Sequence, residues 1–166
     1  MLMAIVVLLV GIIAVAQLVP ASIGSNSTNR NDSSALVFAQ REMNVLRGHP
    51  ITDTLFTDPL GVSCPLAITC DLGNPALPGQ TVGGPVVLDI SGRPVIDFGP
   101  VNGVANYSFT YPDPNDPYGT SYDVRWAVIT TTKNNVATAK RFIVGVQKRS
   151  GNGFFQPITL DTMVER

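Results

Sequence analysis

The side chains that could carry out redox or metal chemistry in this sequence are two cysteines and one histidine. Cys64 and Cys70 lie in the stretch CPLAITC with five residues between them, whereas His49 is far from both. A structural zinc site normally needs four ligands and closer cysteine pairs. The spacing therefore favours a short-loop disulfide, which persists only in an oxidising compartment, with two reduced cysteines as the alternative.

Catalytic and cofactor-binding patterns are not recognisable in the sequence. It contains no G-x-S-x-G, no phosphate-cradling glycine loop and no convincing cluster of metal ligands. An enzyme would have to depend on carboxylates, whose pairing in space a single sequence does not reveal. We therefore expect a non-enzymatic protein without catalytic residues, cofactor or metal, and keep a small membrane-anchored hydrolase as an alternative.

The formal charge of the 166 residues is −1, which argues against a protein that grips nucleic acid by neutralising phosphates. No specific nucleic acid is expected as a partner. Between Tyr122 and Arg149, however, six basic residues stand against the single acid Asp123. Such a segment is either a solvated hairpin or one of two oppositely charged faces by which subunits stack.

An uncharged apolar run opens the chain, MLMAIVVLLVGIIAVAQLVP, in which Gln17 is the only polar side chain. A helix over residues 1–19 would reach about 28 Å, close to the roughly 30 Å hydrocarbon core of a bilayer. No Lys or Arg precedes Arg30, so the run lacks the basic flank of a cleaved signal. The run predicts a retained membrane-spanning helix, with a cleaved signal ahead of a secreted β-domain as the alternative.

Three segments follow one another along the chain. Residues 1–21 are expected to form a transmembrane or fibre-core helix, and residues 22–34 a polar connection with at most weak helical character. Residues 35–166 are expected to form a globular domain of an amphipathic helix and an antiparallel β-sheet. In SALVFAQREMNVLRGHP, apolar residues recur at helical spacing, and Gly48 with Pro50 ends the helix. The stripe predicted to dock on a sheet consists of Leu36, Ala39, Met43 and Leu46.

Beyond the second helix the apolar period changes to two residues, which indicates strands. VVLDISGRPVIDF predicts a hairpin that turns at Ser91 to Pro94 and that carries Leu88 and Ile90 on its apolar face. An antiparallel sheet with one apolar face needs a cover, and the stripe of the second helix is the expected one.

The strand signal is clearest in YDVRWAVIT and KRFIVGVQKR, which predict a long antiparallel pair. Asp123 and Arg125 are expected on its polar outer face. The expected sheet core consists of Tyr122, Val124, Trp126, Val128, Phe142, Val144 and Val146.

The opening run, the polar connection, ALVFAQREMNVLRG and the late strand pair together resemble type IV pilin-like proteins, in particular minor pilins of the PilV type. The resemblance implies an α+β fold, in which a long N-terminal helix spans the membrane with its first half and packs its amphipathic second half on an antiparallel β-sheet. The membrane or fibre-core residues would be Leu2, Ile5, Leu8, Leu9, Gly11, Ile12, Val15 and Val19.

The function implied by the resemblance is a structural subunit of a type IV pilus or a type II secretion pseudopilus, processed by a prepilin peptidase and N-methylated. Its partners would be other pilin or pseudopilin subunits, an inner-membrane assembly platform and the lipid bilayer. Its location would be a single pass in the inner membrane with a periplasmic or extracellular domain, and an extracellular fibre after assembly.

The diagnostic processing site of this family is incomplete here. The family carries a glutamate at the fifth residue of the mature chain, where this sequence has Ile5 if Met1 is the mature start. Our hypothesis is that the true start lies upstream. The alternative function is a secreted or membrane-anchored β-rich binding domain behind a signal segment.

Overall fold

The computed structural model describes residues 11–12, 22, 33–58, 62–64, 69–74, 77, 79–100, 103–113, 119–134, 136–149 and 156–165. Contacts within the chain divide it into two compact units, Met1–Ser34 and Ala35–Arg166. The second unit holds nearly all of the described residues.

The described helix spans residues 33–47. Its last turn is closed by hydrogen bonds from the Gly48 and His49 backbone N–H groups to the carbonyl oxygens of Val45 and Leu46, both at 3.2 Å. Pro50 follows and has no N–H with which to continue the helix. The buried stripe of the helix consists of Ala35, Ala39, Glu42, Met43 and Leu46.

Leu36 does not belong to this stripe, and its predicted docking on the sheet is corrected. Its side chain is 37% exposed, whereas Ala35 is 6% exposed. With about 100° of rotation per residue, position 35 lies nearer than position 36 to the centre of the stripe through Ala39, Glu42, Met43 and Leu46. The helix therefore begins its contact with the sheet one residue earlier than expected.

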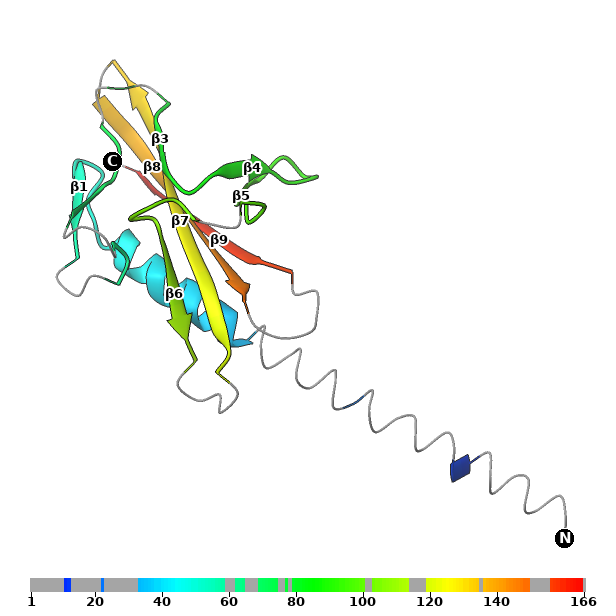
Figure 1. Cartoon of the computed structure of the whole chain (residues 1–166). Coiled ribbons are helices and arrows are strands. Elements are labelled where there is room, and N and C mark those ends of the chain that lie inside the picture. The colour runs from blue at the N-terminus through cyan, green and yellow to red at the C-terminus, as the bar shows by residue number, and fades with distance from the viewer. Residues whose placement is uncertain are drawn as a thin grey trace, which may run out of the picture. The chain divides into compact units, whose positions relative to one another are not determined.

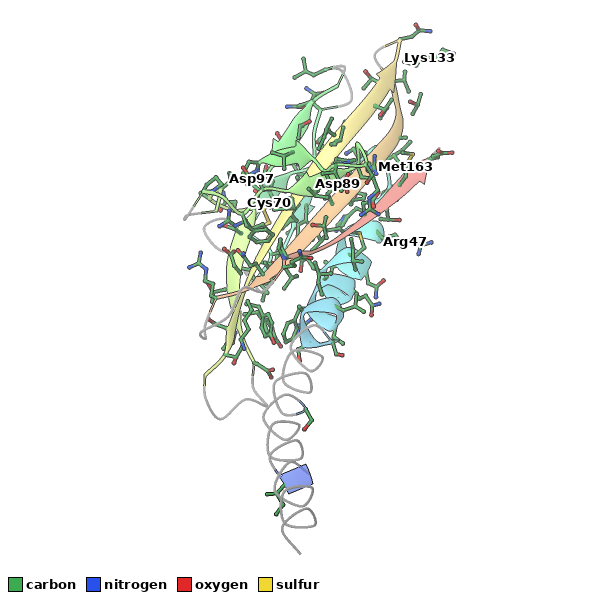
Figure 2. The ribbon with its side chains drawn as sticks, turned by 90° about the vertical axis from the view of Figure 1, so that its right-hand side faces the viewer. Arg47, Cys70, Asp89, Asp97, Lys133 and Met163 are labelled. Carbon is green, nitrogen blue, oxygen red and sulfur yellow. A yellow bond between two sulfur atoms is a disulfide. The ribbon has the colours of Figure 1, made fainter. Side chains whose placement is uncertain are left out.

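A five-stranded antiparallel sheet forms the frame of the second unit (Figure 1). Its order is β3-β7-β8-β9, and β6 pairs with β7 along the same edge as β3. The long strands β7 and β8 run together up to a turn after Lys133 (Figure 2). The strands are β3 (Thr81–Gly83), β6 (Ser108–Pro112), β7 (Ser121–Lys133), β8 (Val136–Lys148) and β9 (Ile158–Glu165).

Two small antiparallel pairs complete the described strands. β1 (Leu55–Thr57) pairs with β2 (Thr69–Asp71) shortly after the helix. β4 (Val86–Leu88) pairs with β5 (Pro94–Ile96), and Figure 1 shows this hairpin extending sideways from β7.

The central strands are covered on both faces. The larger core joins the helix stripe to alternate residues of β7 and β8, each at most 1% exposed: Tyr122, Val124, Trp126, Val128, Phe142, Val144 and Val146. A smaller core on the other face joins Ile96 of β5 to Ala127 and Ile143. Gly145 permits this second contact, because a Cβ at that position would lie 2.7 Å from the Ile96 Cβ.

The predicted α+β fold with a long N-terminal helix is wrong. In the part of the chain that the structure describes, the fold is mostly β, with several antiparallel pairings and a helix of 15 residues. The prediction extended the helix through the opening run. That run is apolar except for Gln17 and has no 3.6-residue period, so its composition could not establish a helix of that length.

The predicted single pass in the inner membrane is corrected as well. Across the described residues no helix is both long and apolar enough to cross a bilayer. The helix at residues 33–47 would reach about 22 Å, short of the roughly 30 Å hydrocarbon core. It also carries the charged residues Arg41, Glu42 and Arg47.

Candidate interaction site

A disulfide joins Cys64 to Cys70, whose Cα atoms lie 6.0 Å apart. Both cysteines are buried, and Cys70 lies in β2 (Figure 2). The Asp58 carboxylate accepts hydrogen bonds from the backbone N–H groups of Ser63 at 2.6 Å and Cys64 at 3.3 Å. The segment that leads into the disulfide is therefore fixed both by its hydrogen bonds to Asp58 and by the disulfide itself.

Trp126 ties this segment to the sheet. Its indole N–H donates a hydrogen bond of 3.0 Å to the Ser63 carbonyl oxygen. Its ring packs against Tyr107 and Phe56, with ring centroids 4.7 and 6.2 Å away. The alternation of β7 places Trp126 in the larger core, where it is completely buried.

A pocket of about 250 Å³, part of it open to solvent, lies between the helix, β6 and this segment. Phe38 packs on Tyr111 with centroids 4.3 Å apart, and the Arg41 guanidinium lies 5.7 Å from the Tyr111 ring centroid. Arg41 also donates a hydrogen bond of 3.2 Å to the Tyr111 hydroxyl. The lining residues are Phe38, Arg41, Glu42, Val62, Phe109, Tyr111 and Val124.

Glu42 is a buried acid in the wall of this pocket. Its side chain is 5% exposed, and its Oε1 atom accepts no hydrogen bond from the described residues. Burial raises the pKa of Glu42 above its ordinary value of 4.5, and the charge of Asp58 raises it further. A hydrogen bond with the Ser63 side chain and the charge of Arg41 act in the opposite direction.

The β4–β5 hairpin exposes apolar side chains at its far end. Leu88 is 71% exposed and Ile90 is fully exposed, so the apolar face predicted for these two residues is not covered. Only the near end of the hairpin is packed, where Val86, Ile96 and Phe98 belong to the smaller core. Alternation distinguishes the two faces of a strand, but it does not show where a hairpin leaves the sheet.

The turn of this hairpin is held by Asp89. Its Oδ1 atom accepts hydrogen bonds from the Ser91 hydroxyl at 2.7 Å and from the backbone N–H groups of Ser91 and Arg93 at 2.8 and 2.9 Å. These bonds, the Ser91 side chain first, hold the pKa of Asp89 well below its ordinary value. Gly92 supplies the positive φ of 78° that the turn requires.

Asp123 and Arg125 do not lie on an exposed polar face, which corrects their predicted placement. Arg125 is 1% exposed and donates to the Asp123 carboxylate at 2.9 Å and to the carbonyl oxygens of Asp97 and Pro100 at 3.2 and 2.9 Å. The Phe98 ring centroid lies 4.9 Å from its guanidinium carbon. The segment after β5 therefore covers a buried ion pair.

Other cations of the basic segment between residues 122 and 149 are also engaged within the domain. Arg149 pairs with Asp123 at 3.0 Å, and Arg141 pairs with Asp161 of β9 at 2.6 Å. Lys140 is fully buried and donates to the Asp53 carbonyl oxygen, and its desolvation lowers the pKa of its ammonium group. Arg141, Arg149 and Lys140 thus contact groups of the same domain, and much of this segment does not form a free basic face.

Most of the residues predicted for the membrane or fibre core lie outside the part of the chain that the structure describes. Gly11 and Ile12 are described, and Ile12 is 61% exposed. The others, Leu2, Ile5, Leu8, Leu9, Val15 and Val19, lie outside the described residues.

The sequence interpretation missed Glu42, Asp58 and Lys140. A signal was present for Glu42, because position 42 is three residues after Ala39 and therefore on the same helix face.

Across the described ranges no group of three or more His, Cys, Asp or Glu side chains could hold a metal ion. Comparisons of the chain with protein-family models, curated proteins and solved structures found no match.

Proposed function

We propose that the chain is a non-enzymatic structural subunit that assembles with other pilin-like subunits, as a minor pilin of a type IV pilus or a pseudopilin of a type II secretion apparatus. The observation that supports this function is the exposure of Val37 and Val45 on the outer side of the helix at residues 33–47. It adds to the resemblance of ALVFAQREMNVLRG and of the late strand pair to that family.

The helix already buries one stripe in the larger core. Three further apolar side chains lie outside that stripe, Leu36 at 37%, Val37 at 58% and Val45 at 42% exposure. A helix on the surface of a lone domain needs only one apolar stripe and carries polar residues on its other side. At about 100° per residue, Val37 and Val45 lie about 80° apart on the outer side with Arg41 between them, and Leu36 lies at the border of the buried stripe. A partner that packs on the outer side would remove Val37 and Val45 from water.

The test replaces the outer side chains and measures assembly. The double variant Val37→Asp/Val45→Asp should keep the urea midpoint of the wild type, because both positions are exposed. It should be lost from filaments isolated from cells that make the chain. The matched control Val136→Asp alters a valine that is 45% exposed at the start of β8, and it should be incorporated normally. Equal incorporation of both variants would contradict the proposal.

A β-rich binding domain is the second candidate, and the exposed end of the β4–β5 hairpin favours it. Leu88 and Ile90 project from a turn that Asp89 holds in place. The isolated filaments also discriminate the two functions. If the wild-type chain is absent from filaments of cells that secrete it, the binding domain is the better assignment.

A further inference from the structure

We propose that the pocket between the helix and β6 binds an alkylammonium group, of the kind that a lysine side chain of another protein carries. This goes beyond the proposed function and does not depend on filament formation. The pocket is the one lined by Phe38, Arg41, Glu42, Val62, Phe109, Tyr111 and Val124.

The first argument is the unpartnered oxygen of Glu42. Only 5% of Glu42 is exposed, and its Oε1 atom accepts no hydrogen bond within the described structure. A buried polar atom left without a partner costs free energy comparable to a lost hydrogen bond. A ligand that donates hydrogen bonds inside the pocket would remove that cost.

The second argument is the charge around the pocket. Two carboxyl groups, Glu42 and Asp58, stand against the single guanidinium of Arg41. The Asp58 carboxylate already accepts two backbone N–H groups, and Arg41 already donates to the hydroxyl of Tyr111. Glu42 is the carboxyl group among the lining residues, and Asp58 acts on it from outside the lining. A further positive group is therefore complementary to Glu42, whereas an anion would be repelled by its carboxylate.

The third argument is the shape and material of the walls. Phe38, Phe109 and Tyr111 offer aromatic surface, which attracts cations, and Val62 and Val124 offer apolar surface for an alkyl stem. The enclosed room is small, about 20 Å³, which is space for about one water-sized group. A compact ammonium on a short stem suits this size better than a second planar guanidinium.

Binding should be coupled to the protonation of Glu42. The groups that face it are Arg41 from the helix, Asp58 after β1, Ser63 from the disulfide segment and Tyr111 from β6, while β7 contributes Val124. Burial raises the pKa of Glu42, and a cation bound beside it would stabilise its carboxylate. The ligand should therefore bind more tightly as the pH rises through this pKa.

The experiment titrates the full chain with Nα-acetyl-lysine methylamide and follows the backbone amide NMR signals of the residues that line the pocket, and in the wild type also the Glu42 carboxyl carbon. The norleucine derivative, which has the alkyl stem without the ammonium group, tests the need for the charge, and 1,4-diaminobutane represents a free polyamine. We expect saturable shifts with the lysine probe, none with norleucine, and at least about tenfold weaker binding to the Glu42→Gln variant. Glu165→Gln, an exposed acid on β9, is the matched control and should bind as the wild type does.

Several results would overturn the proposal. Equal binding of the norleucine and lysine probes, or unchanged affinity of Glu42→Gln, would show that the pocket does not recognise an ammonium group. Tighter binding of the diamine than of the lysine probe would reject a protein lysine as the ligand. In the wild type itself, the pKa of Glu42 must fall when the lysine probe saturates the pocket, and a constant pKa contradicts the proposal whether or not the variants fold.

Discussion

The indole N–H of Trp126, in the middle of β7, donates a hydrogen bond of 3.0 Å to the carbonyl oxygen of Ser63. The backbone N–H of Ser63 donates a hydrogen bond to Asp58, and its side chain forms a hydrogen bond with Glu42. One short segment therefore connects the sheet core, the disulfide and the wall of the pocket. Changes in the core should be felt at the candidate site.

Trp126→Phe should lower the free energy of unfolding by about 2 kcal/mol, because it removes a buried hydrogen bond and leaves a cavity in the larger core. Urea denaturation measures the loss. Tyr107→Phe is the control, since it removes a hydrogen bond of 3.1 Å to the Asp71 carbonyl oxygen at a partly exposed position. It should cost about 1 kcal/mol or less. If both variants lose the same free energy of unfolding, the hydrogen bond from Trp126 to Ser63 does not contribute more than the exposed one of Tyr107.

Cys64→Ala/Cys70→Ala should lower the free energy of unfolding by about 2 kcal/mol, because the disulfide closes a short loop in the unfolded chain. Adding a reductant to the wild type should shift its urea midpoint to that of the double variant. The double variant itself should not respond to the reductant. A wild-type midpoint that is insensitive to complete reduction would show that the disulfide does not stabilise the fold.

Arg125→Met should cost about 3 kcal/mol, because it removes one partner of a buried ion pair and leaves Asp123 with Arg149 alone. Arg93→Met removes an ion pair whose Arg93 side chain is 64% exposed, and it should cost less than about 1 kcal/mol. Thermal and urea unfolding of both variants compare the two sites. Similar losses would contradict the burial of Arg125 beneath the segment after β5.

Glu42→Gln should stabilise the folded chain near neutral pH. The folded state raises the pKa of Glu42, so it binds the proton more tightly than the unfolded state does. The contribution of Glu42 to the free energy of unfolding is therefore fully present below its ordinary pKa of 4.5. It is lost as the pH rises through the folded-state pKa. The melting temperatures of wild type and variant should coincide at about pH 4 and separate by pH 7. Parallel curves over this range would contradict the shift.

The long strands are the part of this fold that sequence reasoning reaches most directly. Successive side chains along a strand point to opposite sides of the sheet, so the side of β7 and β8 that carries Val124, Trp126 and Val144 follows from the period of the strand alone. The sequence interpretation treated the other side as solvent, because it contains Asp123 and Arg125. Their burial depends on carbonyl groups supplied by the distant segment after β5, which no local pattern reveals.

The candidate pocket could be predicted only in part. Helical periodicity places Glu42 on the buried face between Ala39 and Leu46, and this much follows from the sequence. The approach of Tyr111 and Val62 to that face depends on how β6 and the disulfide segment fold over the helix. Such contacts join parts of the chain that are far apart in sequence, and a single sequence does not report them.

The β4–β5 hairpin is ordered before anything touches it. Because Asp89 fixes the turn through three short hydrogen bonds, the backbone that displays Leu88 and Ile90 has already given up its conformational freedom in the isolated chain. A protein that covers these two side chains would be spared most of the ordering entropy that a flexible loop loses on association. Loosening the turn, with Asp89→Ala for instance, should thus weaken such a complex without removing a single atom from its interface.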